Sequence, residues 1–312
     1  MVLSKVKEIA GFLKIVFVEF SEDKAFKLSA ALSYYTIFSL APFLIIVISF
    51  AGFFYGREAA EGVVYQQLNG FVGGDAALQI QEMIKNVHLT GNTMLAGIVS
   101  IVALVIGATG IFAEIQDSIN GIWKLRSKPK RGILKILLNR LLSFSLILSL
   151  GFLLMVSLIL DALISGLSNQ LTRIFPGRNV QFVNIFDNVL TLIVITILFG
   201  VIFKVLPDAK IRWKDIGIGA VVTAVLFMVG KFAISYYISK GNFSNAYGAA
   251  GSIVVIMVWI YYSAVILYLG AEFTQVYAMR YGGKISPNDY AVWIKVEKRE
   301  VEQPEIEKQA GN

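Results

Sequence analysis

Six stretches of this chain contain no Asp, Glu, Lys or Arg, and they constrain its fold more than any other feature. They cover residues 28–56, 86–113, 141–160, 188–203, 216–230 and 241–271. About 20 apolar residues in a helix cross a hydrocarbon layer of roughly 30 Å. Four stretches reach that length, and the two shorter ones reach it if Lys204 and Lys231 lie near helix ends, where long side chains extend to the interface. The pattern therefore predicts membrane-spanning segments.

We predict an all-α fold, a polytopic membrane helix bundle with six transmembrane helices. Helices are required because lipid offers the backbone no hydrogen-bond partners, and no segment shows the two-residue alternation of barrel strands. The expected spans cover residues 30–56, 94–118, 139–165, 184–205, 213–239 and 249–278. Charged residues make up only 16% of the chain, against about 25% in a soluble domain, which argues against a soluble enzyme.

The distribution of basic residues predicts the orientation of the bundle. The N-terminal segment, the second and fourth loops and the C-terminal tail carry 22 of the 28 Lys and Arg residues, whereas the other three loops carry 5. Because basic residues are enriched in cytoplasmic loops, we expect both termini in the cytoplasm. Trp123, Trp213 and Tyr281 are expected to anchor helix ends at the membrane interfaces.

The chain is expected to contain three regions. Apolar residues recur at three- and four-residue spacing near the start of the chain, between lysines, at Val6, Ile9, Leu13, Val16 and Phe20. This pattern predicts an N-terminal interfacial amphipathic helix in residues 1–28, with a cytoplasmic extension of the first span as the alternative. Residues 29–280 form the transmembrane domain, with an outer loop at 57–92, and residues 281–312 form a charged cytoplasmic tail, solvated or disordered from about residue 283.

Several segments resemble the YihY/virulence factor BrkB family of bacterial inner-membrane proteins. They are Ala31 to Pro42 (ALSYYTIFSLAP), Gly110-Ile111-Phe112, Asn120 to Trp123 (NGIW), Leu206-Pro207-Asp208, Trp213-Lys214-Asp215, Gly219-Ala220, Tyr247-Gly248, Trp259-Ile260-Tyr261 and Leu269 to Glu272 (LGAE). The resemblance spans about residues 25 to 280 and implies a multi-pass, six-helix protein of the bacterial inner (plasma) membrane. Members of this family carry serum-resistance names, an old ribonuclease BN label and proposals of envelope transport.

The residue composition argues against catalysis. The chain has no cysteine, and its single histidine, His88, lies in the outer loop. RNA hydrolysis needs a metal cluster or a set of His, Lys and carboxylate groups on a water-accessible surface. A glycine-rich GK[ST] loop for nucleotides is also missing. We therefore expect no enzymatic activity, no metal, no cofactor and no nucleic-acid partner, and we reject the ribonuclease hypothesis.

Charged side chains at membrane depth suggest a polar path through the bundle. Each costs about 2.5–3.5 kcal/mol at a helix centre, so each invites a functional explanation. The candidate intramembrane polar path comprises Glu114, Asp117, Glu272, Lys231, Asp161, Asp187 and Pro42. The first three form an expected inner acidic cluster that faces the bundle interior and shares Lys124 or Arg126. Lys231 forms an expected outer ion-pair lock with Asp161 and Asp187. The alternative is that these charges pair near the interfaces for assembly and that the proline kink is merely packed.

The second loop is the best electrostatic signal, because it has seven basic residues from Lys124 to Arg140 and no acid. The candidate anionic headgroup site comprises Lys124, Arg126, Lys128, Lys130, Arg131, Lys210, Arg212 and Lys214. Each basic residue near a membrane surface contributes about 1 kcal/mol of attraction to anionic lipid. The alternative is that these residues only determine topology. The predicted partners are anionic membrane lipids, while a second copy of the chain or an envelope protein stays open.

These features together predict a transporter or lipid-handling protein for an anionic amphiphile or lipid of the cell envelope. The alternative is a non-transporting membrane scaffold for envelope assembly.

Overall fold

The computed structural model describes residues 2–38, 62, 78, 110–128, 180–241 and 251–295. Its candidate membrane spans are Asn188–Val205, Trp213–Ile238 and Val254–Arg280, which are long and apolar enough to cross a bilayer. They coincide with the predicted fourth, fifth and sixth spans. The predicted third span, most of the first two, the outer loop except residues 62 and 78, and the end of the tail lie outside the described residues, so the count of six stays a prediction.

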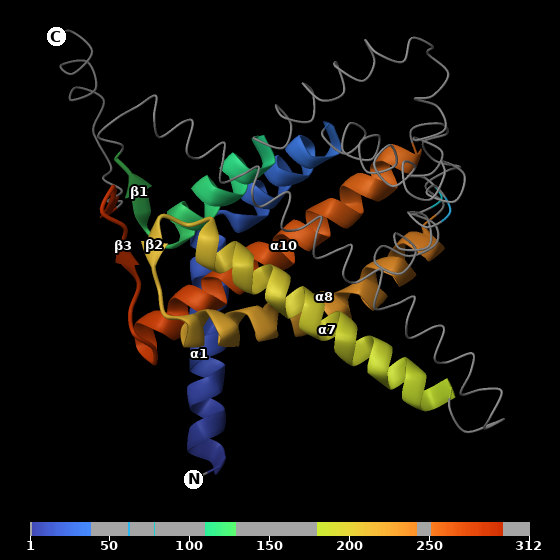
Figure 1. The fold of residues 1–312 in the computed structure, drawn as a ribbon, viewed down its shortest axis with the longest axis horizontal. Coiled ribbons are helices and arrows are strands. Elements are labelled where there is room, and N and C mark those ends of the chain that lie inside the picture. Colours follow the sequence, from blue (N-terminus) through green and yellow to red (C-terminus); the bar gives the residue numbers. More distant parts are fainter. Residues whose placement is uncertain are drawn as a thin grey trace, which may run out of the picture.

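Three long helices form the described part of the bundle (Figure 1). They are α7 (Val180–Val205), α8 (Trp213–Lys240) and α10 (Gly251–Arg280). Helix α8 packs against both α7 and α10. Each helix satisfies its own backbone hydrogen bonds, as lipid requires.

Helix α8 carries exposed aromatic side chains near both of its ends. Trp213 begins the helix and lies under the Lys204 ammonium, while Tyr236 lies near the end beside Lys240. At 1.5 Å per residue these two aromatics are about 34 Å apart along the axis. That separation is close to the thickness of a hydrocarbon layer, at whose borders Trp and Tyr are enriched. The expected place of Trp213 at an interface is consistent with this spacing and stays a prediction.

Helices α8 and α10 approach each other through a reciprocal pairing of glycine with threonine. A Cβ on Gly219 of α8 would lie 2.9 Å from the Cβ of Thr274, and a Cβ on Gly270 of α10 would lie 2.8 Å from the Cβ of Thr223. Both threonine hydroxyls are satisfied within their own helices, by the carbonyls of Gly219 and Gly270. Small residues permit this close approach in membrane bundles, so the spacing of these two helices is fixed here.

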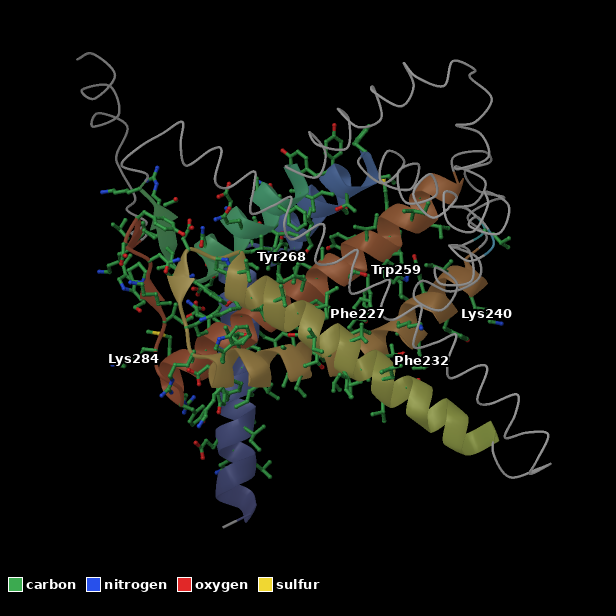
Figure 2. The ribbon with its side chains drawn as sticks, viewed as in Figure 1. Phe227, Phe232, Lys240, Trp259, Tyr268 and Lys284 are labelled. Atoms are coloured by element: carbon green, nitrogen blue, oxygen red, sulfur yellow. The ribbon has the colours of Figure 1, made fainter. Side chains whose placement is uncertain are left out.

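Aromatic rings fill the space between the three helices. The Phe199 ring lies 5.9 Å from Phe227, whose ring lies 5.9 Å from Trp259, and both pairs meet edge to face. Figure 2 shows Phe227 and Trp259 between the helices and Phe232 on an outer surface. These edge-to-face pairs join α7, α8 and α10 in one core.

Helix α1 (Val2–Glu22) is only partly an exposed amphipathic helix. Of the predicted stripe, Val16 and Phe20 are buried, and Phe12 packs edge to face on Phe273 of α10 with ring centroids 5.2 Å apart. The other stripe residues, Val6, Ile9 and Leu13, are exposed. Helix α1 crosses the bundle steeply and projects its N-terminus outward (Figure 1). Its expected position at the membrane interface stays a prediction.

Two shorter helical segments, 25–38 and 110–122, complete the described helices. In the first, the hydroxyls of Ser29, Ser33 and Thr36 donate to carbonyls of their own helix, those of Ala25, Ala30 and Leu32. Each of these hydroxyls therefore has an acceptor within its own helix. Pro42 lies outside the described residues.

Four short strands gather at one end of the bundle, which we call the strand end (Figure 1). Strand β1 (Leu125–Ser127) pairs antiparallel with β4 (Ala291–Trp293), and β2 (Ala209–Lys210) pairs antiparallel with β3 (Ser286–Pro287). The expectation of a disordered tail from about residue 283 is therefore wrong as far as residue 295. Backbone pairing with two loops orders it, which charge content alone does not reveal.

The strand pairs place the second loop, the fourth loop and the tail at the same end of the bundle. Lys284 lies at this end and Lys240 at the opposite one (Figure 2). The count of basic residues assigns these three segments to one membrane side, and the arrangement agrees with it. That this side is cytoplasmic stays a prediction.

Candidate functional site at the strand end

A buried carboxylate on α10 is the most unusual group at the strand end. Glu272 has no exposed surface, and neither carboxylate oxygen has a hydrogen-bond donor in the described part of the chain. A buried polar group without a partner costs free energy, and a buried charge costs more. Glu272 thus differs from the other buried carboxylates of this end, which are all hydrogen-bonded.

Glu272 faces a charged cluster contributed by two other segments. Lys124 adopts a left-handed backbone conformation (φ 57°) just after the segment 110–122, and Asp23 lies in the turn after α1. The Lys124 ammonium donates to both Asp23 oxygens, one of them at 2.6 Å, and lies 3.6 Å from Glu19. Both Asp23 and Lys124 interact electrostatically with Glu272. One cation therefore serves three carboxylates.

The surroundings of Lys124 raise the pKa of its ammonium group. Burial by itself lowers the pKa of Lys124. The hydrogen bond and the charge of Asp23, together with the charges of Glu19 and Glu272, outweigh burial and raise this pKa above its ordinary value. Lys124 therefore remains a cation inside the cluster.

Trp123, the neighbour of Lys124 in the chain, connects the segment 110–122 to α10 beside Glu272. Its indole is fully buried and donates to the carbonyl of Ala271, 3.1 Å away, next to Glu272. The expectation that Trp123 is an interfacial anchor is therefore wrong, because its N–H finds a backbone acceptor inside the protein. By contrast, Tyr281 is exposed and donates to Glu8 of α1 at 2.9 Å.

The predicted inner acidic cluster forms only in part. Glu272 faces the interior and shares Lys124 as expected, but its carboxylate neighbours are Asp23 and Glu19. Glu114 is half-buried and accepts from Ser118 at 3.4 Å, whereas Asp117 is exposed. Glu114 and Asp117 are three residues apart on one helical segment, yet they do not share a buried face. The buried face of this segment runs through Ser118, which Asp117 does not share.

Tyr268 links the two groups of acids along α10. It lies one turn before Glu272, and its buried hydroxyl has no hydrogen-bond partner in the described residues. Ser118 and Glu114 of the segment 110–122 face this hydroxyl. Sequence reasoning missed Tyr268 because a tyrosine in an apolar helix looks like core.

The predicted outer lock lies mostly outside the described residues. Lys231 is half-buried in α8, but Asp161 and the side chain of Asp187 are not described. The lock stays a prediction.

A second polar contact ties the turn between α7 and α8 to the segment 110–122. The buried Asp208 carboxylate accepts from Asn120 (3.1 Å) and from Gln116 (3.2 Å), and the Asp208 N–H donates back to Asn120 at 2.8 Å. The Asp208 carbonyl accepts the N–H of Asn288 at 3.0 Å. Burial and the nearby Asp208 raise the pKa of Tyr290. This contact is structural, since every strong group in it is satisfied.

A third buried carboxylate holds the end of α10. Asp215 Oδ2 accepts from the Gly283 N–H (2.9 Å) and from Arg212 Nε (3.2 Å). A Cβ on Gly283 would overlap the present position of the Arg212 side chain, which would have to shift to make room. Asp215 and Asp208 explain why their motifs are polar without giving either a chemical role.

The predicted headgroup residues separate into two groups. Lys124, Lys210 and Arg212 are engaged in ion pairs with Asp23, Asp289 and Asp215. The hydrogen bond from Lys210 lowers the pKa of Asp289. Arg126, Lys128 and Lys214 are exposed and form no ion pair with the residues that the structure describes. Lys130 and Arg131 lie outside those residues.

Within the same described ranges, no group of three or more His, Cys, Asp or Glu side chains could hold a metal ion. The three carboxylates around Lys124 are held by an ammonium group instead.

Comparison with known proteins places the chain among membrane proteins. Residues 16–291 match the family described as virulence factor BrkB. A UPF0761 membrane protein of Tolumonas auensis is 27% identical over 81% of this chain and 80% of its own length, and one of Pseudoalteromonas atlantica is 25% identical over 84% of each. YfkH of Bacillus subtilis, whose name calls it ribonuclease-like, is 25% identical over 84% of this chain and 93% of its own. No solved structure matches.

Proposed function

This chain is an integral membrane protein of the virulence factor BrkB family, and we propose that it transports or otherwise handles an anionic amphiphilic lipid of the bacterial inner membrane. The proposal includes no ribonuclease or other enzymatic activity, because the chain offers one histidine and no cysteine.

The observation that carries the proposal is the set of free cations at the strand end. Arg126, Lys128 and Lys214 extend outward without an ion pair among the described residues. Lys214 follows Trp213, whose exposed ring supports a place for this helix end at the membrane interface. Anionic headgroups lie at that level, so these cations are within their electrostatic range. Arg126 is the strongest candidate for a phosphate contact, since guanidinium can pair with it bidentately.

The internal ion pairs narrow the predicted headgroup site. Lys124 and Arg212 already neutralise largely buried carboxylates, so releasing them to a lipid would leave those carboxylates unpaired. Lys210 and Asp289 are both exposed, so their ion pair is worth little and Lys210 remains a further candidate. The proposed contacts are therefore Arg126, Lys128 and Lys214, with Lys130 and Arg131 as further candidates from the sequence.

A lipid-binding experiment tests the headgroup contacts. The triple variant Arg126→Gln, Lys128→Gln and Lys214→Gln is compared with a control that removes three cations elsewhere: Lys7→Gln, Lys14→Gln and Lys240→Gln. We expect native mass spectrometry to detect phosphatidylglycerol on the wild type and the control, and much less on the triple variant. Added salt should weaken the wild-type binding more than that of the triple variant. Equal retention by both triple variants would contradict the proposal.

Movement of lipid across the bilayer separates transport from scaffolding. Proteoliposomes that contain fluorescent phosphatidylglycerol are treated with a membrane-impermeant quencher, and we expect faster loss of the inner-leaflet signal with wild-type protein than with empty vesicles. Binding without movement would favour the scaffold alternative. Orientation must be checked in each variant, because removing basic residues also weakens the topology signal.

A further inference from the structure

We infer that Glu272 and Asp23 form a proton-binding site at the strand end, in which the two carboxyl groups share one proton. The inference concerns proton binding by the resting protein and does not depend on lipid handling.

The contact between the two acids is the first observation. The Asp23 carboxyl lies within hydrogen-bonding reach of Glu272, yet neither oxygen of Glu272 has a donor among the described residues. Two carboxylates are both acceptors, so their contact becomes a hydrogen bond only when one of them carries a proton. Without that proton the two like charges repel each other in a buried place.

The charge balance of the cluster is the second observation. The titratable groups that act on Glu272 are Asp23 and Glu19 on the side of α1, and Lys124 after the segment 110–122. One ammonium faces three carboxylates, which leaves an excess of two negative charges. Glu19 is partly exposed to solvent, so the uncompensated charge that is costly to bury is the one on the Glu272–Asp23 pair, and one bound proton removes it.

The position of the proton follows from the hydrogen bonds. Asp23 already accepts from Lys124 through both oxygens, whereas Glu272 accepts from nothing described. A proton from water therefore bonds to a Glu272 oxygen, and the new O–H donates to Asp23. This hydrogen bond fastens the turn after α1 to α10, so loss of the proton loosens the attachment of α1.

A metal cation suits this site less well than a proton. A metal ion would need several free oxygen ligands, but both Asp23 oxygens are engaged by Lys124. The ammonium itself also repels a second cation at that distance.

Infrared spectroscopy of the full chain in lipid nanodiscs tests the inference. Protein labelled with carboxyl-13C glutamate should show a protonated glutamic acid C=O band at neutral pH. Glu272→Gln should lose the band, and Asp23→Asn should shift it, because the hydrogen-bond acceptor changes. The matched control Glu22→Gln, which removes an exposed acid next to Asp23, should keep it unchanged.

Glu272→Gln is expected to fold, because its amide N–H can donate to Asp23 as the protonated acid does. Its thermal midpoint should therefore fall less than that of the wild type when the buffer becomes alkaline. If the labelled wild type shows no protonated glutamic acid at neutral pH, or if the band survives in Glu272→Gln, the inference is wrong. A Glu272-dependent thermal shift with sodium but not with choline would assign the site to a metal cation instead and would also overturn it.

Discussion

Replacing Asn120 with Leu is expected to detach the turn between α7 and α8 from the segment 110–122. The Asn120 side chain donates to Asp208 Oδ2 at 3.1 Å and accepts the Asp208 N–H at 2.8 Å, and both residues are buried. Leucine would leave that N–H without an acceptor, which costs about 1–3 kcal/mol, and would remove a hydrogen bond to a carboxylate, which is worth about 1.5–3 kcal/mol. Because the two terms overlap, the loss is smaller than their sum, and we expect about 2–5 kcal/mol.

Cysteine labelling measures this loss without interference, because the chain has no cysteine of its own. Ala291 is buried in β4, and the tail that leads to it is held by the Asn288 N–H on the Asp208 carbonyl. In an Ala291→Cys background, a loss of about 3 kcal/mol should speed labelling on the order of a hundredfold, if labelling follows the opening equilibrium. Unfolding in mixed micelles gives the same free energy independently.

The comparison with Gln116→Leu makes the prediction refutable. Gln116 is half-buried and gives the same carboxylate a single hydrogen bond at 3.2 Å, and its loss leaves no backbone group unpaired, so it should cost about 1.5 kcal/mol, the lower end of the range for a bond to a carboxylate. The prediction is wrong if the free energy of unfolding of Asn120→Leu lies within about 0.5 kcal/mol of the wild-type value, or is no lower than that of Gln116→Leu. In either case the Asn120–Asp208 hydrogen bonds do not hold the turn between α7 and α8.

Three further predictions follow from the packing, the charges and the topology. Gly219→Ala should destabilise the protein by about 1–3 kcal/mol, because its Cβ meets Thr274. Gly217→Ala, whose Cβ would have nothing within 4 Å, should be neutral or stabilising. Equal thermal stability of the two variants would contradict the reciprocal pairing of glycine with threonine. Lys124→Gln should lower stability by about 1–2 kcal/mol at neutral pH, since it leaves three acids without their cation. Because the pKa of Lys124 is raised in the folded protein, its contribution should be complete below its ordinary value of 10.5 and vanish as the pH rises through the raised value; a difference that persists at higher pH would refute this. Single cysteines at the exposed positions 128 and 210 should react only from the cytoplasmic side, and labelling of position 128 in intact cells would overturn the orientation.

The sequence by itself determined the class of the protein and the places of its described spans. Helices α7, α8 and α10 contain the predicted spans, because a membrane helix is a local property of about 20 consecutive residues. It also predicted that Glu272 shares a basic partner from the second loop, Lys124 or Arg126, and the structure brings Lys124 to it. The excess of Lys and Arg in the second loop, the fourth loop and the tail predicted that these segments lie on one side of the membrane. The strand pairs likewise place them at one end of the bundle.

The tertiary structure decided which polar groups meet. Lys124 pairs with Asp23 across 101 residues of sequence, Asn120 with Asp208 across 88, and Trp123 with Ala271 across 148. Hydropathy and charge counts sum over neighbours in the chain, so they carry no information about which helix lies beside which. For the same reason the sequence did not predict that the tail pairs as strands with two loops. It also assigned Asp23 to an interfacial segment, because only the packing of α1 against α10 places Asp23 next to Glu272.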